Sequence, residues 1–534
     1  MIFISHASKD YTSVLPLVQF METTGFKCWI SERDLPSDKE DWAASIMDAL
    51  GSSDIVFLYL TSNAIQSGEV ENEIANASSM KKNVIPYIAE KTVLTQAFKY
   101  CLSKYQWIQA YLMEEKSARD ILRKRILENS NAERDSFWNL KLTPAYRAFV
   151  RKVMLLYYGP SYFIHINDHD FPVFCIRGSS IPHATSISDY DILCDFDHSV
   201  LSDFSVDDHQ TYKQLKWYKE YSHILEGKIR HPNRPGYMLD ELVTDEDGLI
   251  SKIRVHVGTY AENVYSNHVL EYELYRAFQE FSQEDLDDPD VQQRLFDFLE
   301  LRNKMHSHAG GRNDAGFSKG MYESLLRGDA RDSLLSVQML VIMRSSRTHR
   351  YEAKLIQRSR DVAAEPGLYQ FLPAGGFEIL NDSDDDIYDD IELWDNFSPG
   401  CAVFREYLEE LFNIPEFAGG GKGSIEDRLF KDPRIVEIEQ MLRDGRAEFH
   451  FLGSVMGLSG LRQELSFTLV IHDESYSEKQ FIANEECKKG IVHSIPIEKF
   501  ETARYRQIWD LLHGPSAAMW KLFRETPLYE KLTQ

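Results

Sequence analysis

The sequence predicts an α/β protein whose first segment folds as a parallel sheet covered by helices. Over roughly residues 1–111, short apolar runs alternate with amphipathic helical patterns, an order typical of parallel sheets with right-handed crossovers. One of these runs, Ile55–Leu60 (IVFLYL), is apolar throughout, as expected of a strand buried on both faces. A chain of 534 residues also exceeds what one hydrophobic core organises, so we expect two or three domains.

Each element of the first segment follows from its hydrophobic period. Leu15, Val18 and Met21 fall on one helical face, which predicts the first helix. The same spacing predicts helices at Val14–Thr24, Trp42–Leu50 and Val70–Met80. Short apolar runs predict strands at Ile2–Ser5, Phe26–Ile30, Ile55–Leu60, Val84–Ile88 and Gln106–Ile108.

Three further regions are predicted after the first segment. Residues 112–158 are charged and helical, which indicates a helical connector, and 159–330 form an accessory α+β region. Residues 331–534 mix strands and helices and predict a second α+β domain. The middle region has strands at Tyr162–Ile166 and Phe171–Ile176, with helical patterns around Val269–Phe281 and Val291–Met305. The last region has strands at LLSVQMLVIMR, AKLIQRS and Ser466–Ile471, an acidic loop at 381–400, and helices at Ala402–Phe412 and Arg506–Leu522.

Composition narrows the class of protein. The formal net charge is −25, from 84 acidic and 59 basic residues, and a field of that sign repels phosphate backbones, so we expect no direct nucleic-acid binding. The six cysteines have no paired spacing, which disfavours zinc sites and a disulfide framework. No signal peptide or membrane-spanning run is predicted. A cytoplasmic protein without membrane contact is therefore expected.

Motifs in the first segment resemble those of TIR domains. They are IFISHASKD on the first strand, WISERDLP after the second, SDIVFLYLTSNAIQS on the third, VENEIANA on the next helix, and VIPYIAE with QWI after it. The resemblance covers roughly residues 1–111 and implies a flavodoxin-like sheet. In such sheets, ligands bind beyond the carboxyl ends of the strands.

The resemblance also implies a catalytic residue. TIR domains that cleave NAD⁺ carry a glutamate in a pattern like S-x-W-x-x-x-E, and here Ser67 through Glu73 reads SGEVENE, with Glu69 in place of the tryptophan. Glu73 takes the catalytic position. A carboxylate there stabilises the positive charge that develops on the ribose when nicotinamide leaves. The alternative is that Glu69, Glu71 and Glu73 are acidic residues favoured by the helix dipole.

Other residues of the TIR motifs are predicted to bind the substrate. Ser5, His6, Arg33 and Asp34 sit at strand ends, and Trp42 is placed to stack on a base. The alternatives remain open: a structural hydrogen bond for His6, a surface ion pair for Arg33, and ordinary packing at a helix start for Trp42.

The last region resembles a divergent Nudix domain in KLIQRS, LPAGGFE and FREYLEEL. Glu406, Glu409 and Glu410 fall on one helical face, and the resemblance implies that they bind Mg²⁺ or Mn²⁺, which polarises a diphosphate. The spacing from Gly376 to Arg405 is 29 positions (405 − 376) because of the acidic insertion, and Phe412 replaces a motif glycine. A solvated acidic face is the alternative.

One short motif lies in the middle region. Arg302–His308 resembles the R-x(4–6)-H signature of HEPN ribonucleases, or else is a helix end with capping residues.

These motifs lead to three hypotheses. The first is an NAD⁺ hydrolase or cyclase in anti-phage defence, activated by self-association of TIR domains and regulated by an ADP-ribose-like nucleotide bound to the Nudix-like part. The second is a non-enzymatic TIR assembly module with a nucleotide-sensing Nudix-like part. In the third, the Nudix-like half is the main enzyme, hydrolysing ADP-ribose, and the TIR domain only oligomerises it.

Overall fold

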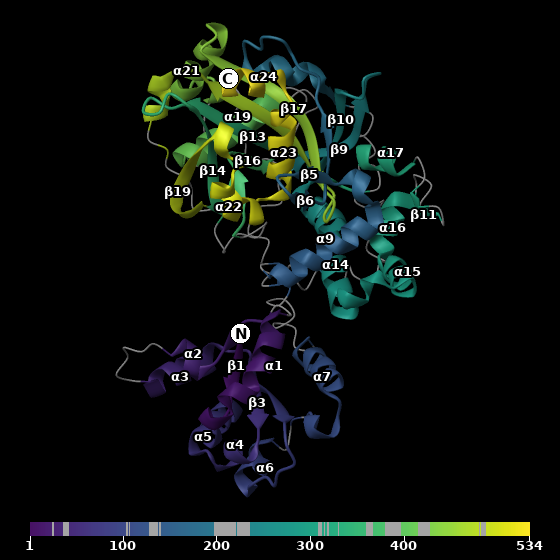
Figure 1. Ribbon diagram of the computed structural model, residues 1–534, viewed down its shortest axis with the longest axis vertical. Helices are drawn as coiled ribbons and strands as arrows, with labels where there is room; N and C mark the ends of the chain where they lie inside the picture. The colour runs from purple at the N-terminus through teal and green to yellow at the C-terminus, as the bar shows by residue number, and fades with distance from the viewer. Residues whose placement is uncertain are drawn as a thin grey trace. The chain divides into compact units, whose positions relative to one another are not determined.

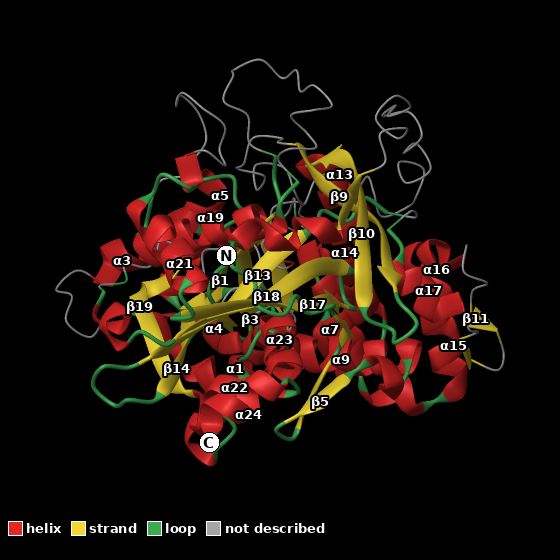
Figure 2. Ribbon diagram, turned by 90° about the horizontal axis from the view of Figure 1, so that it is seen from above, coloured by secondary structure: helices red, strands yellow, loops and turns green. Residues whose placement is uncertain are grey.

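The computed structural model divides into two compact units, the first of which is Met1–Ala148. Figure 1 colours the chain from its N-terminus to its C-terminus, and Figure 2 colours helices and strands. The structure describes residues 1–23, 26–35, 42–102, 105, 107–127, 137, 140–141, 143–196, 221, 235–307, 312–313, 316–317, 320–328, 331–358, 367–379, 397–414, 428–479, 481 and 487–534. Within these residues, no helix is long and apolar enough to cross a membrane.

The first unit is built on a parallel four-stranded sheet in the order β2-β1-β3-β4. A single parallel bridge from Tyr87 to Ile108 extends it beyond β4. The predicted parallel α/β fold is therefore confirmed. The bounds are β1 Ile2–Ser5, α1 Tyr11–Thr23, β2 Cys28–Trp29, α2 Ser31–Asp34, α3 Trp42–Ser52, β3 Ile55–Leu60, α4 Ser62–Gln66, α5 Gly68–Ser79, β4 Asn83–Ile88, α6 Gln96–Leu102 and α7 Glu115–Leu127, with short 3₁₀ turns at Ser8–Asp10 and Ala110–Leu112.

Helices cover both faces of this sheet because its strands are apolar on both sides. Ile2 and Ile4 of β1 pack with α1 and with Leu122 and Ile126 of α7. Phe3, between them in sequence, faces the opposite core with α3, α5 and α6. The alternation of β1 side chains between the two cores follows from the period of two along a strand. The helical cover of the sheet thus continues past residue 111, into α7.

The second unit contains the described residues from Phe149 onward. Its main sheet has eight strands, with the path β15-β14-β13-β18-β17-β7, while β16 pairs with β13 and β19 with β14. Strand β7 of the middle region pairs with β17 over Gly453–Gly457. The strands are β7 Val173–Arg177, β13 Ser336–Arg344, β14 Tyr351–Arg358, β15 Tyr369–Phe371, β16 Ala374–Gly376, β17 Ala447–Gly457, β18 Arg462–Ile471 and β19 Cys487–Pro496.

Helices again flank the main sheet. Helices α19 and α21 contact strands of it, and the apolar residues of α23 pack into a core with Leu340, Leu355 and Val470. The helices of this unit are α9 Pro144–Tyr158 (which begins in the first unit), α13 Tyr260–Asn263, α14 Val269–Glu280, α15 Pro289–Phe298, α16 Glu300–Ser307, α17 Gly320–Leu326, α19 Pro399–Phe412, α21 Pro433–Arg443, α22 Arg506–Asp510, α23 Gly514–Arg524 and α24 Pro527–Thr533. The remaining strands are β5 Ile164–Ile166, β6 His169–Phe171, β8 Cys194–Phe196, β9 Pro235–Thr244, β10 Ile250–Thr259, β11 Arg312–Asn313 and β12 Gly316–Phe317, and a π-helical turn spans Val264–His268.

Two predicted helices are wrong in extent. The helix predicted at Arg506–Leu522 is divided into α22 and α23, because Gly514-Pro515 starts a new helix with proline in its first turn. The pattern at Val291–Met305 is likewise divided, at Leu299, into α15 and α16. Gln106, Trp138 and residues 381–396 of the predicted acidic loop lie outside the described residues.

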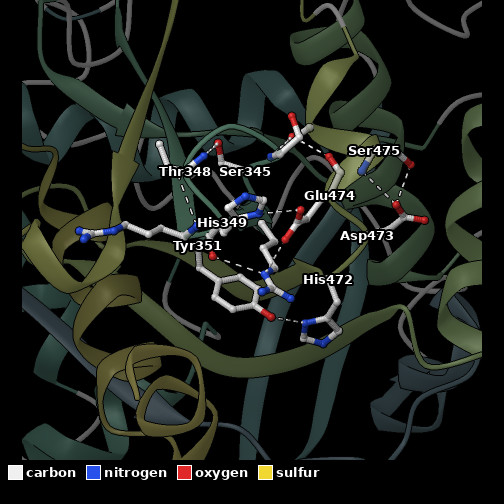
Figure 3. A network of polar contacts seen from close by, with 12 residues as sticks. Ser345, Thr348, His349, Tyr351, His472, Asp473, Glu474 and Ser475 are labelled. Carbon is white, nitrogen blue, oxygen red and sulfur yellow. Dashed lines mark hydrogen bonds and ion pairs between the residues drawn. The ribbon is translucent and has the colours of Figure 1, made fainter.

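A polar network lies in the second unit where β13 and β18 end and β14 begins (Figure 3). The Tyr351 hydroxyl and His472 Nδ1 are 2.8 Å apart, and His472 Nε2 lies 2.8 Å from Glu448 Oε1. Lys531 of α24 donates to the same carboxylate oxygen at 2.8 Å. Glu448 thereby links α24 to the sheet.

Candidate functional site

The candidate site lies at the carboxyl end of β1, where a buried serine meets a glutamate. Ser5 is the last residue of β1 and is fully buried. Its hydroxyl donates to Oε2 of Glu73 at 2.6 Å. Glu73 lies on α5, which begins after Ser67, whose side chain caps the helix by accepting from the Val70 amide. The strand end and the helix thus hold the serine and the carboxylate together.

The surroundings of Glu73 favour its protonated form. The pKa of this carboxyl is raised to about 7, mainly by burial and also by the charges of Glu69 and Glu32, although the hydrogen bond from Ser5 opposes the shift. Desolvation penalises the charged form of an acid, and like charges act in the same direction. A carboxyl that titrates near neutral pH can gain or lose a proton during a reaction.

His6 lies beside this pair, and its imidazole contacts the carboxylate of Glu32, the first residue of the loop Glu32–Asp41 that was predicted to border the nucleotide. Its Nε2 is 3.1 Å from Oε2 of Glu32, in ion-pair range, although the two groups are not aligned as a hydrogen bond. The side chain of His6 is 1% exposed and that of Glu32 is 26% exposed. Glu32 belongs to α2, a one-turn helix that the apolar pattern did not predict, since no residue of α2 is buried. The SERD string after the second strand was the only signal for it.

Arg33 and Asp34 form a separate network. Arg33 donates to Glu22 at 2.8 Å, to Asp34 and to the carbonyl of Cys28. The hydrogen bond with Asp34 raises the pKa of the Arg33 guanidinium. Burial tends to raise the pKa of Asp34, but hydrogen bonds from Arg33 and from the Ile30 amide bring it below its usual range. Arg33 is thus committed to an ion-pair network on α2 and α1, and its predicted contact with substrate stays a prediction.

Trp42 is the first residue of α3, and half of its surface is exposed. Residues 36–41, which precede it, lie outside the described chain. An exposed indole is available for stacking, so this role of Trp42 also stays a prediction. A hollow of about 400 Å³ adjoins α3 and is lined by Asp34, Asp48 and Trp29, among others, but not by Ser5, His6 or Glu73.

A buried aspartate fixes the loops around the candidate site. Asp10 accepts hydrogen bonds from the Thr61 hydroxyl and, at 2.7 Å, from the Asn63 amide. Thr61 also caps α4 by accepting from Ala64 N at 3.1 Å. The turn after β1 and the turn after β3 are therefore bound to each other at the edge where Ser5 ends its strand.

In the second unit, the three predicted metal ligands lie on α19 against the glycine-containing strand β16. Glu410 Oε2 accepts from the Ala374 amide at 2.9 Å. Arg405 donates to the Gly376 carbonyl and to Glu406 Oε1, both at 3.1 Å, and lies 3.9 Å from Glu409. A Cβ at Gly375 would lie 2.1 Å from the carboxyl carbon of Glu406. This is why glycine is needed at Gly375 for the carboxylate to reach the strand.

The structure does not gather these glutamates around a metal position. Among the described residues, no group of three or more His, Cys, Asp or Glu side chains is arranged to hold a metal ion. The carboxylates of Glu406 and Glu410 are instead bound to protein groups. The metal site stays a prediction.

The HEPN-like motif contributes to packing. Arg302 is fully buried and donates to Tyr158 and to the carbonyls of Leu458 and Ser459. His306 lies between the hydroxyls of Tyr158 and Ser324. His308 lies outside the described residues. These bonds tie α16 to α9 and to the turn before β18.

Comparisons with known proteins show that the first segment is similar to TIR domains. Residues 2–123 match the family model described as TIR domain. The TIR domain of the Toll-related receptor TRR-2 from Hydra magnipapillata is similar, with 17% identity, a TM-score of 0.21, and coverage of 25% of this chain and 97% of that chain. A search of curated protein sequences found no match.

Two solved structures of Nudix proteins are also similar. The NUDIX domain of Shewanella oneidensis NrtR, complexed with ADP ribose, has 14% identity, a TM-score of 0.21, and covers 39% of this chain and 98% of that chain. A NUDIX hydrolase from Alicyclobacillus acidocaldarius has 14% identity, a TM-score of 0.19, and covers 35% and 96%.

Proposed function

We propose that the TIR domain formed by residues 2–123 cleaves the bond between nicotinamide and ribose in NAD⁺, with Glu73 as the catalytic carboxylate. The observation that supports this most directly is the Glu73 carboxyl itself. It is largely buried at the carboxyl end of β1, is held 2.6 Å from the Ser5 hydroxyl, and has a pKa raised to about 7. Ligands of open parallel sheets bind at this edge.

The chemistry needs one well-placed anion. When the glycosidic bond breaks, nicotinamide leaves as a neutral molecule with the bonding electron pair, and the ribose gains oxocarbenium character. The ionised Glu73 stabilises that positive charge in a site with little water. Attack by water then yields ADP-ribose and one proton, whereas attack by the adenine ring of the same molecule gives the cyclic product. Ser5 keeps the carboxylate oriented in either case.

A fluorogenic NAD⁺ analogue tests this assignment. The wild-type protein should convert the analogue to a fluorescent product. Glu73→Ala should lower kcat by at least about a hundredfold, as expected when a group that stabilises transition-state charge is removed. Glu71→Ala is the matched control, since Glu71 is an exposed acid on the same helix. Activity that persists in Glu73→Ala removes the catalytic assignment.

We further propose that self-association of TIR domains activates the enzyme and that a nucleotide such as ADP-ribose regulates it, in a role in anti-phage defence. The Nudix-like motifs of the second unit support the choice of ligand, because ADP-ribose shares its diphosphate and adenosine with NAD⁺. Mass spectrometry of co-purified nucleotides would identify the ligand, and mass photometry with and without it would detect assembly. A chain that stays monomeric while fully active contradicts this part.

The second candidate function is hydrolysis of ADP-ribose by the second unit. The contact of Glu410 with the Ala374 amide supports it, because this contact places the glutamate-bearing helix on the glycine-containing strand. Release of AMP from ADP-ribose in the presence of Mg²⁺ or Mn²⁺, abolished by Glu409→Gln, would establish it. Without metal-dependent release of AMP, this function is excluded.

A further inference from the structure

A second carboxylate stands beside the candidate site, on the one-turn helix α2. Glu32 is the second residue of α2, directly after β2. Its carboxylate lies 3.1 Å from Nε2 of His6. His6 follows Ser5 in the chain, and Ser5 holds Glu73. The ends of β1 and β2 therefore bring two acidic side chains to the same two neighbouring residues.

His6 is buried where its imidazole meets the Glu32 carboxylate. The His6 side chain is almost completely enclosed, so its ring cannot turn to solvent for a partner. The Glu32 carboxylate lies within ion-pair distance of the buried Nε2 without the alignment of a hydrogen bond, and the Ser31 hydroxyl donates to the same carboxylate oxygen at 2.8 Å. Glu32 itself keeps about a quarter of its side chain exposed, which leaves this carboxylate accessible from solvent.

We propose that Glu32 is a positioning residue of the NAD⁺ site: its carboxylate, 3.1 Å from the His6 imidazole, is a second negative charge that acts with Glu73 on a substrate carrying a cationic pyridinium ring. This inference rests on the proposed function. Glu32 acts through space on Glu73 and on the pyridinium ring, and takes no part in bond breaking. It therefore favours a positively charged nicotinamide over the neutral, reduced ring.

The groups that face Glu73 determine the sign of the expected effect. They are the Ser5 hydroxyl from β1, the Glu69 carboxylate from α5 and the Glu32 carboxylate from α2, with His6 beside Ser5. The negative charge of Glu32 raises the pKa of Glu73. Removing that charge should lower the pKa, so Glu73 would stay ionised to lower pH. Removing the charge of Glu32 should also weaken the attraction between the site and the cationic pyridinium ring of NAD⁺.

The test uses the full-length chain with Glu32→Gln, Glu32→Asp and, as the matched control, Glu71→Gln. In Glu32→Gln, the acidic limb of the kcat/KM profile for NAD⁺ should move to lower pH by about half a unit. At pH 8, where Glu73 is ionised in every variant, KM should rise about two- to fivefold with little change in kcat. Glu32→Asp should restore both values, and Glu71→Gln should change neither. A Glu32→Gln profile that coincides with that of Glu71→Gln overturns the inference.

A second measurement does not depend on activity. A water-soluble carbodiimide with an amine modifies protonated carboxyl groups, and peptide mass spectrometry locates the modified residue. The pH midpoint for modification of Glu73 should be lower in Glu32→Gln than in wild type and unchanged in Glu71→Gln. If the midpoint moves while no variant cleaves NAD⁺, the electrostatic role stands and the proposed function fails. If NAD⁺ is cleaved and the midpoint does not move, the inference fails and the function stands.

Discussion

At the scale of the residue, the buried carboxyl of Glu73 lowers the free energy of unfolding when it is ionised. Because its folded pKa of about 7 lies above the ordinary value of 4.5, the folded state holds a proton that the unfolded state releases between these values. Stability is therefore lost as pH rises through this window. Glu73→Gln should be more stable than wild type at pH 8, by about 1–3 kcal/mol, and the gain should disappear near pH 4.5. Urea unfolding at both pH values, with Glu71→Gln alongside, measures this. An equal gain at both pH values contradicts the assigned protonation.

Ser5 and Glu32 should affect the pKa of Glu73 in opposite directions. The Ser5 hydroxyl donates to the carboxylate and so favours the ionised form. In Ser5→Ala, the acidic limb of the kcat/KM profile for NAD⁺ should move to higher pH by up to about one unit. Ser8→Ala, at an exposed serine of the following turn, serves as the control. A shift to lower pH would mean that Ser5 does not hold the ionised carboxylate.

At the scale of the element, two glycines of the second unit should respond differently to the same change. A Cβ at Gly400, in the first turn of α19, would meet the backbone carbonyl oxygen of Ile187 at 2.0 Å. A Cβ at Gly375 would meet the end of the Glu406 side chain, which can rotate away. Gly400→Ala should therefore destabilise the unit by about 1–3 kcal/mol, and Gly375→Ala by less. Thermal unfolding of both variants provides the comparison, and equal losses would contradict these packing contacts.

At the scale of the whole molecule, the net negative charge of the protein opposes binding of the proposed substrate. The chain carries a net charge of −25, and NAD⁺ itself bears two negative phosphates, so the long-range field repels it. Salt screens this repulsion within about 8–10 Å at physiological ionic strength. KM for NAD⁺ should therefore fall as NaCl is raised from low to physiological concentration, with kcat nearly constant. Steady-state kinetics across a salt series measure this, and a KM that rises with salt would indicate a locally basic binding surface.

The amino-acid pattern predicted the elements that alternate between apolar strands and amphipathic helices. The first four strands, helices α1, α3 and α5, and later β13, β14 and α19 all follow from local periodicity. Periodicity fails where an element buries nothing, as in α2, and where a glycine-proline pair starts a new helix within one apolar pattern, as at Gly514. Glu73 was found because it stands in a linear motif with defined spacing.

The residues that surround Glu73 could not be predicted from local sequence, because they come together only in the packed fold. Ser5 and Glu73 are 68 positions apart in sequence, and Glu32 reaches His6 across two strand ends. Such contacts depend on strand order and on the register of β1 between β2 and β3, which no local pattern encodes. The same reason explains Arg33, which its motif places at a strand end but which folding binds to Glu22. Burial, and with it the raised pKa of Glu73, is a property of the packed sheet and not of the sequence around one residue.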